Sequence, residues 1–441
     1  MRIKLFENYL FAILWIIPWS FLCLWFELYF FLFINFFFID YYILKLINWN
    51  IFDKIKIPVW LSIIWNWMKT ILIALLITIF IKTILIEAYK IPTPSMEKTL
   101  LVGDYLLVSK IAYGPRLPYT PLSLPFLPSM LPGGILTYYK SPAIPYKRLK
   151  GLTSIQRNDI IVFNFPEGDT VVIDMEGQNY YTLLRQYGKH YMETSYKLIS
   201  HPIDKRDNYI KRCVAIPGDT LKIIMGDVFI NNQILNNKSS QIAKYYVRTK
   251  KEIINDTILN LLGLSSEEIS YHFSNNIHII PADSSGYKIL KNYSEVQSIQ
   301  RYIEPSLSFR NAEIFPHSLN YSWSPDIFGP LLVPGRGITI ELTTENLPLY
   351  KRIISINEGN KIEIKDDNIY INGNLAHSYT FLMNYYFVLG DNRPNSADSR
   401  FWGFVPEDHV VGKAIYIWYS KETGQKLPDG IRTERMFKSI K

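Results

Sequence analysis

The chain has 441 residues, of which 48% are hydrophobic, and a formal net charge of +8. Its apolar residues cluster near the N-terminus, where residues 9–47 contain three charged residues and residues 71–86 contain one. This distribution excludes a disordered or collagen-like chain and argues against a wholly soluble cytoplasmic enzyme. The basic excess would suit nucleic acid or an anionic membrane surface. The basic residues are scattered, without the basic helix stripe that would suit nucleic acid, and the two apolar runs favour the membrane.

The first 88 residues are predicted to form a membrane anchor. A helix of about 20 apolar residues crosses a bilayer core, and the run at about 63–86 is long enough. The run at about 9–47 is too long for one span, because at about 1.5 Å per residue it would reach roughly 60 Å. Glu27 is a candidate hairpin tip in that run, although neither Gly nor Pro stands beside it. We expect two or three transmembrane helices, and either number places the residues after Ala88 outside by the positive-inside rule.

The rest of the chain is predicted to be mostly β. Short segments rich in β-branched and aromatic residues alternate with Gly, Asn, Asp and Pro, which is typical of strands joined by turns. Thr257–Glu268 is expected to be a short helix. Pro115–Gly134 contains six prolines, a density that excludes helix and central strand. This loop either packs over the β core or dips into the lipid interface. The predicted strands are Tyr105–Val108, Asp159–Phe165, Thr220–Ile224, Val228–Ile230, Ile362–Ile364 and Ile369–Ile371.

One internal repeat aligns residues 218–233 (GDTLKIIMGDVFINNQ) with residues 359–374 (GNKIEIKDDNIYINGN) without a gap. Each copy is predicted to form a β-hairpin that ends in an Ile-Asn turn. Upstream of the hairpins, YIKRCVAI in the first copy resembles YKRIISI in the second, with one residue shifted. The repeat therefore offers two lysines, Lys211 and Lys351, for one catalytic role.

Three short motifs carry the chemistry, at 91–96 (IPTPSM), 208–219 (NYIKRCVAIPGD) and 390–406 (GDNRPNSADSRFWGFVP). In their order, their spacing and their position after an anchor they resemble the boxes of type I signal peptidases, membrane-bound serine proteases with a Ser–Lys dyad. The closest similarity is to long bacterial members with inserts between the boxes. The resemblance implies N-terminal transmembrane helices followed by a mostly-β extracytoplasmic catalytic domain with a β-rich insert.

The resemblance also assigns the dyad. A serine hydroxyl is a poor nucleophile until a base removes its proton, and a lysine is a base only when burial lowers its pKa from about 10.4. No histidine lies near Ser95 in the sequence, and the seven histidines show no metal-ligand spacing. By resemblance, Ser95 is the nucleophile and Lys211 the general base, while the Thr93 hydroxyl and the Ser95 N–H form the oxyanion hole. Pro94 stands where the family often has Gly, and we expect it to stiffen the nucleophile turn.

The third motif supplies the supporting residues. By resemblance, Ser396 hydrogen-bonds the catalytic lysine and orients it. Asp398 and Arg400 correspond to a structural pair that braces the loop, and Asp391 is expected to support the same loop. No cofactor and no metal are implied.

The predicted organisation is an anchor at 1–88, a catalytic core in two parts at 89–233 and 350–420, an insert at 234–349 and a basic, solvated tail at 421–441. The resemblance implies a multi-pass protein of the cytoplasmic membrane with its catalytic domain on the periplasmic side. Its partners would be the bilayer and secreted preproteins with small residues at the first and third positions before the cut, and no nucleic acid.

Two alternatives are weaker. A self-cleaving repressor with the same Ser–Lys chemistry would need a soluble DNA-binding N-terminus, which the apolar run at 9–47 argues against. A catalytically dead scaffold would be signalled by loss of Ser95 or Lys211, and both are present.

Overall fold

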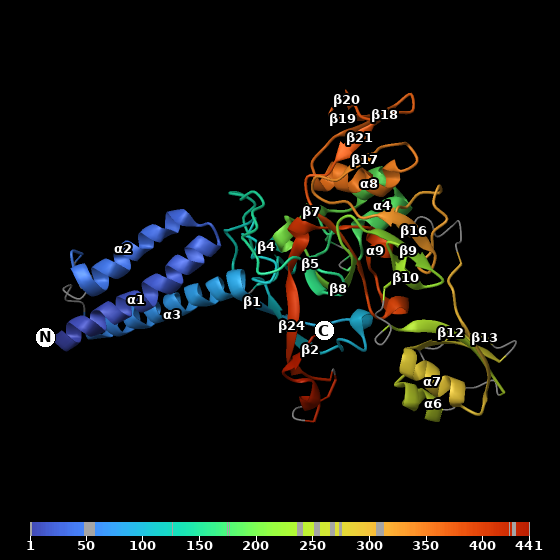
Figure 1. Cartoon of the computed structure of the whole chain (residues 1–441), viewed down its shortest axis with the longest axis horizontal. Coiled ribbons are helices and arrows are strands. Elements are labelled where there is room, and N and C mark those ends of the chain that lie inside the picture. Colours follow the sequence, from blue (N-terminus) through green and yellow to red (C-terminus); the bar gives the residue numbers. More distant parts are fainter. Residues whose placement is uncertain are drawn as a thin grey trace. The chain divides into compact units, whose positions relative to one another are not determined.

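The computed structural model describes most of the chain, in two compact units (Figure 1). The first unit comprises Met1–Glu87, Lys110–Leu117 and Pro145–Thr153, and the second comprises Ala88–Ser109, Pro118–Ile144 and Ser154–Lys441. The described residues are 2–47, 58–125, 127–173, 175, 177–235, 241–250, 256–264, 270–272, 276–305, 313–422, 424–425 and 429–440.

The first unit begins with a helical hairpin. Helix α1 (Arg2–Trp25) is followed by a reversal in which Glu27 adopts a left-handed conformation, with φ 58°. The returning arm contacts α1 through stacked rings, including Phe11 on Tyr42 at 6.1 Å. The chain thus turns at the predicted tip, using a non-glycine residue in a conformation that usually favours glycine. The returning arm consists of η1 (Tyr29–Phe33), α2 (Ile34–Ile39) and η2 (Asp40–Leu44).

Within the described part of the chain, two helices are long and apolar enough to cross a bilayer. They are the segment Phe6–Trp25 of α1 and Trp60–Leu85, which covers most of α3 (Val59–Phe80) and all of η4 (Ile81–Leu85). Their side chains are largely exposed, unlike those of a buried core helix. The arm Phe31–Leu44 is apolar but shorter.

The second unit is built on one antiparallel sheet in the strand order β1-β2-β24-β5-β8-β22-β23, with β25 added on β24. Strands β5 and β22 are buried at every residue, because both faces of the sheet are covered there. The predicted strands at 105–108 and 159–165 are confirmed as β2 and β5. The bounds are β1 Ile86–Lys90, β2 Asp104–Ser109, β5 Ile160–Asn164, β8 Asn208–Ala215, β22 Tyr385–Leu389, β23 Val405–Pro406, β24 Val410–Ser420 and β25 Lys438–Ser439.

The repeat is confirmed in its hairpins, which share the same strand register and the same side-chain hydrogen bond at their ends. Lys222 faces Phe229 in the first copy as Glu363 faces Tyr370 in the second. At the ends of the hairpins, Asn231 accepts from the Thr220 N–H at 2.9 Å, and the equivalent Asn372 accepts from the Lys361 N–H at 2.8 Å. The strands are β9 (Thr220–Ile224), β10 (Asp227–Ile230) and β11 (Gln233–Ile234), then β18 (Ile362–Lys365), β19 (Asn368–Ile371) and β20 (Asn374–Leu375).

Upstream of the hairpins the two copies differ, which corrects the expected equivalence of the two lysines. Lys211 lies on strand β8, whereas Lys351 lies on helix α8 (Leu347–Arg352), which continues as η9 (Ile353–Asn357). Lys351 is exposed, because α8 buries its Leu349 and Tyr350 side instead. Only the hairpins are therefore structurally repeated.

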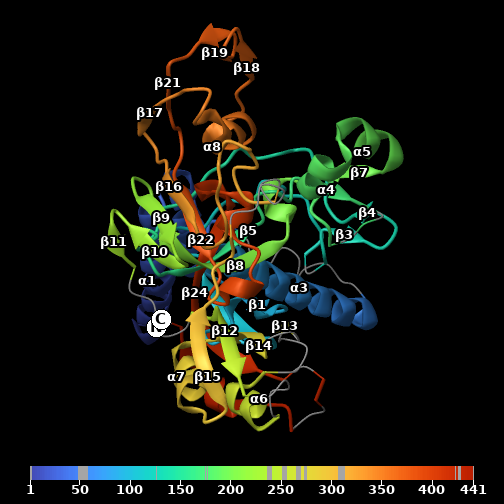
Figure 2. The same ribbon diagram turned by 90° about the vertical axis from the view of Figure 1, so that its right-hand side faces the viewer.

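Within the insert a second small layer pairs a sheet with two helices (Figure 2). The strand order is β13-β14-β12-β15, and the helices pack on it through Val247, Leu259, Ile280 and Leu290. The helix expected over 257–268 is α6, although residues 265–268 lie outside the described residues. The bounds are β12 Ala243–Thr249, α6 Asp256–Leu262, β13 Ser270–His272, β14 Ile277–Ala282, α7 Ser284–Asn292 and β15 Val296–Arg301.

Several shorter elements complete the second unit. Strand β16 pairs with β9, although it belongs to the predicted insert by sequence. The proline-rich loop contains no helix among its described residues, as predicted, and ends in the short hairpin β3–β4. The remaining bounds are β3 Met130–Leu131, β4 Ile135–Leu136, β6 Thr170–Val172, α4 Tyr180–Tyr187, α5 Lys189–Ser195, β7 Leu198–Ser200, β16 Phe328–Leu332, β17 Thr339–Glu341, β21 Ser378–Thr380 and α9 Ser399–Trp402.

The basic tail is not a solvated end, contrary to the prediction. Arg435 donates to the carboxylate of Asp104 at 2.6 Å, and Ser420 donates to the same carboxylate at 2.6 Å. Asp104 is fully buried, so its charge requires a cation close by. The tail packs because its arginines neutralise a carboxylate at the start of β2.

Candidate active site

Ser95 lies on a single helical turn, η5 (Pro94–Met96), between strands β1 and β2. Pro94 takes the first position of the turn, where its fixed φ is compatible with helix and its missing N–H costs nothing. Met96 and Leu100, both fully buried, anchor the following residues in the core. Ser95 itself is 7% exposed, so the turn presents its hydroxyl inward rather than to bulk solvent.

Strand β8 brings Lys211 to this hydroxyl. Lys211 Nζ lies 2.6 Å from Ser95 Oγ and donates to the Ile210 carbonyl oxygen at 3.1 Å. Lys211 is 3% exposed, and its Nζ lies 5.8 Å from the centre of the Tyr209 ring. A primary amine is thus held in hydrogen-bond contact with a serine hydroxyl in a nearly dry environment.

Burial changes the protonation of Lys211. Desolvation of the ammonium lowers the pKa of Lys211 from 10.5 to about 8, against the carboxylates of Asp398 and Asp391, which raise it. The Arg400 guanidinium adds a smaller lowering effect. A lysine of this kind is neutral in an appreciable fraction of molecules near neutral pH, as a general base must be.

The first predicted oxyanion-hole residue lies next to the nucleophile. Thr93 Oγ1 is 3.5 Å from Ser95 Oγ, at the outer limit of a hydrogen bond, and the Thr93 backbone is extended. This placement is compatible with a hydroxyl that turns toward a developing oxyanion. Its participation, like that of the Ser95 N–H, remains a prediction.

The third motif packs directly against the nucleophile turn. The Asn392 N–H donates to the Ser95 carbonyl oxygen at 3.1 Å, which links the loop after β22 to the turn. A side chain at Gly390 would overlap Ser396 Oγ and approach the Ser95 carbonyl oxygen to 2.5 Å. Only glycine permits this close approach of the two segments.

The predicted brace is present as a buried ion pair. Arg400 Nε and Nη2 donate to the two oxygens of Asp398, both at 2.8 Å, and both residues are at most 2% exposed. Burial alone would raise the pKa of Asp398, but Arg400 and hydrogen bonds outweigh it and lower that pKa. Ser396 is buried beside Gly390. Among the described residues, no hydrogen bond joins it to Lys211, so its orienting role stays a prediction.

Arg212 is a residue that sequence reasoning missed. Its guanidinium donates to both oxygens of Asp391, at 2.9 and 2.7 Å, and the Thr99 hydroxyl donates to the same carboxylate at 2.6 Å. Arg212 is 3% exposed and Asp391 is 1% exposed. The ion pair ties β8, which carries Lys211, to the third motif and, through Thr99, to the segment that follows Ser95. The signal was available in the Lys-Arg dipeptide, since a basic residue beside a buried lysine needs a carboxylate partner.

Comparison with known proteins identifies the family of this chain. The family model of signal peptidase, peptidase S26, matches residues 64–276 and 380–419, over half of the chain. The chain belongs to the peptidase S26 family. The matched segments contain Ser95, Lys211 and the third motif, so the residues that meet in the structure are those that the family model spans. The chain is accordingly a serine peptidase.

Individual relatives agree with the family match. A protein named signal peptidase I from Buchnera aphidicola subsp. Acyrthosiphon pisum is 28% identical over 357 residues, covering 81% of this chain and 76% of the relative. One of the same name from Haemophilus influenzae is 25% identical, with 83% and 73% covered. A third, from Buchnera aphidicola subsp. Baizongia pistaciae, is 24% identical, with 82% and 79% covered.

Proposed function

We propose that this S26 peptidase is a signal peptidase I that cleaves N-terminal signal peptides from secreted preproteins. The observation that carries the proposal is the 2.6 Å contact between Lys211 Nζ and Ser95 Oγ in a nearly dry site. The family match and the names of the relatives support the same substrate class.

In the proposed mechanism, neutral Lys211 accepts the Ser95 proton while Ser95 Oγ attacks the scissile carbonyl carbon. Negative charge on the carbonyl oxygen is stabilised by the Ser95 N–H and the Thr93 hydroxyl, each contributing a few kcal/mol at most. The Lys211 ammonium then returns its proton to the leaving amine, which is the N-terminus of the mature protein. Water, deprotonated by Lys211, hydrolyses the acyl-enzyme and restores Ser95.

The proposed location of this chemistry is the outer face of the cytoplasmic membrane. Ser95 follows Ile86, where the apolar helix gives way to β1, by only nine residues, so connectivity keeps the nucleophile near the end of a predicted span. A signal peptide in the membrane presents its cleavage site at that height. Its residues before the cut would bind as an added strand, with small pockets at the first and third positions.

The proline-rich loop would reinforce membrane association. Its Leu122, Leu124 and Leu127 are 52%, 59% and 49% exposed, so the loop presents leucines to its surroundings. The loop is also packed on the catalytic unit, since the Thr120 N–H donates to Asp204 at 3.0 Å and the Ser129 hydroxyl donates to the Lys205 carbonyl oxygen at 2.7 Å. We propose that its exposed leucines contact the lipid interface while the rest of the loop stays on the core.

A cleavage assay tests the proposal. The purified full chain in detergent should convert a preprotein to its mature form, cut after a small residue, as read by N-terminal sequencing of the product. The Ser95→Ala chain should insert and fold normally and yield no product. Processing by that variant at a rate near that of the wild type would remove Ser95 from the nucleophile role.

A further inference from the structure

The insert touches the catalytic loop at the start of β12. The Ile242 N–H donates to the Asp391 carbonyl oxygen at 3.0 Å, and Ile242 forms a parallel bridge with Asn392. Ile242 is 5% exposed, so this contact lies in the buried interior and not at the protein surface. The insert thus lies against the loop that itself bonds the Ser95 carbonyl.

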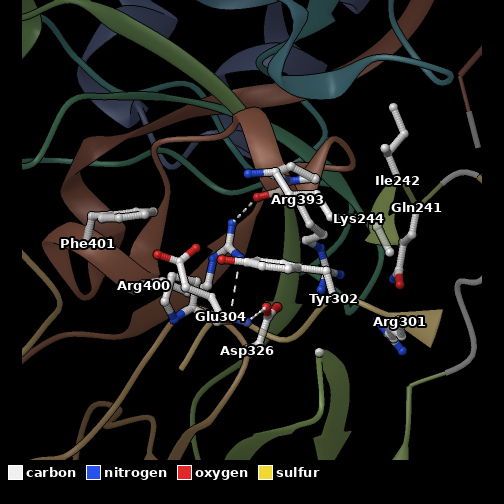
Figure 3. Close-up of a pocket in the computed structure, with 14 residues that line it drawn as sticks. Gln241, Ile242, Lys244, Arg301, Tyr302, Glu304, Asp326, Arg393, Arg400 and Phe401 are labelled. Carbon is white, nitrogen blue, oxygen red and sulfur yellow. Dashed lines mark hydrogen bonds between the residues drawn. The ribbon is translucent and has the colours of Figure 1, made fainter. Parts of the chain in front are cut away.

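Two depressions flank this junction. Figure 3 shows the first, which Arg393, Arg400, Glu304 and Asp326 line, with Arg393 above Asp326 in the view. Two of its charged side chains are already engaged: Arg400 is paired with Asp398, and the Asp326 carboxylate accepts from the Glu304 N–H at 2.8 Å. We assign it a structural role in joining the insert to the third motif.

The second depression has two distinct walls. Glu97, Lys98 and Asn392 of the catalytic core form one wall, and Leu262, Leu264 and Asp283 of the insert form the other. We call this depression the insert groove. It combines partly exposed apolar surface from Leu264 with amide and charged groups, a mixture that suits an extended peptide better than a small ligand.

The insert groove is continuous with the nucleophile turn. Asn392 Nδ2 donates to the Pro94 carbonyl oxygen at 3.3 Å and to Glu97 Oε2 at 3.4 Å. Glu97 and Lys98 follow Ser95 by two and three residues. The groove therefore starts on the side of the turn that follows Ser95, whereas the base lies on β8 and Thr93 precedes the nucleophile.

We propose that the insert groove holds the first residues of the mature protein, on the leaving-group side of the cut. This rests on the proposed function, because it concerns the preprotein substrate of the same dyad. Residues before the cut are expected alongside strand β8, which carries Lys211, and the turn that carries Ser95, so the chain after the cut must leave in another direction. The insert groove is a depression of suitable chemistry that begins beside the nucleophile turn.

Two features of the groove fit a peptide of varied sequence. The Asp283 carboxylate is already engaged by the Gly286 N–H at 2.8 Å and by the Ser285 hydroxyl at 2.7 Å, so it does not demand a basic partner. Leu264 offers a partly exposed apolar side chain, whereas the amide nitrogen of Asn392 is already bonded to Pro94 and Glu97. The N-terminal sequences of mature secreted proteins differ widely. A groove of this kind would bind a peptide through its backbone and shape more than through the charge of its side chains.

A pair of tryptophan variants tests the assignment. Leu264→Trp would partly fill the groove, while Leu261→Trp adds the same bulk on α6 at a residue that is 58% exposed and does not line the groove. Each is assayed with a full preprotein and with a peptide that ends one residue after the cut. We expect Leu264→Trp to lower kcat/KM for the preprotein about tenfold, or roughly 1.4 kcal/mol, and to leave the short peptide within about twofold. Leu261→Trp should leave both substrates within about twofold.

A second measurement needs no variant. With the wild type, kcat/KM for peptides lengthened residue by residue after the cut should rise and then level off once the groove is filled. Equal effects of Leu264→Trp on long and short substrates, or no dependence on length, would overturn the groove assignment while leaving the proposed function intact. Failure of the wild type to cleave any of these substrates would instead overturn the proposed function, and the groove assignment with it.

Discussion

Raising the pH should activate the peptidase, because its proposed base is a lysine that burial makes easier to deprotonate. Lys211 must lose a proton before it can accept one from Ser95. With its pKa lowered to about 8, the activity should rise through that pH and level off above it. A histidine base would instead give a rise near pH 6.5.

The lowered pKa of Lys211 sets how strongly activity should depend on pH. At pH 7 a lysine with a pKa of about 8 is neutral in about 9% of molecules, against about 0.03% for one at 10.5, so burial increases the competent fraction about 300-fold. The same shift costs roughly 3 kcal/mol of folding free energy while the lysine remains protonated. Between about pH 6 and pH 9 the neutral fraction, and with it kcat/KM, should rise about 90-fold.

The assay is kcat/KM for one peptide substrate across this range, with folding monitored at each pH. The rise should have unit slope on a logarithmic scale and a midpoint near the lowered pKa. A midpoint near 6.5 that disappears when one histidine is replaced would refute a lysine base. A midpoint above 10 would refute the claim that burial tunes Lys211.

Three further outcomes are expected. Lys211→Met should be inactive yet unfold at higher denaturant than the wild type near pH 7. That advantage should shrink between about pH 8 and pH 10.5, because there the unfolded wild type holds a proton that the folded one has lost. Asp398→Asn should lower the free energy of unfolding by roughly 3–5 kcal/mol, since it leaves Arg400 buried without its carboxylate; a loss below about 1 kcal/mol in denaturant titrations would contradict the brace. A polarity-sensitive dye on Leu124→Cys should shift to the blue in reconstituted vesicles, while the same dye on the exposed control Leu319→Cys should not, and equal shifts would argue against lipid contact of the loop.

The secondary structure that the sequence predicted well follows from local patterns. Strand β9 was predicted at its observed bounds because its β-branched residues are flanked by Gly-Asp pairs at 218–219 and 226–227. The Asn231 and Asn372 turns recur at the ends of the two hairpins. Ser95 and Lys211 were paired through motif resemblance, and the structure places their side chains in contact.

The features that it missed depend on partners far along the chain. The similarity of YKRIISI to the β8 sequence would place Lys351 on a strand, but the packing of Leu349 and Tyr350 selects a helix there. Arg435 was assigned to a solvated tail, since nothing in the local pattern reveals its partner Asp104, which lies 331 residues earlier. An ion pair between residues so far apart leaves no periodic pattern in the local sequence, so the sequence alone does not predict it.

The most direct test of the Ser95–Lys211 dyad is the cleavage of one preprotein by single lysine variants at matched folded concentration. Lys211→Ala and Lys211→Arg should both be inactive, because alanine has no base and arginine keeps its proton at any usable pH. Lys351→Ala, which truncates an exposed side chain on α8, should retain most of the wild-type rate. An active Lys211→Ala enzyme beside an inactive Lys351→Ala enzyme would contradict the assignment of the base.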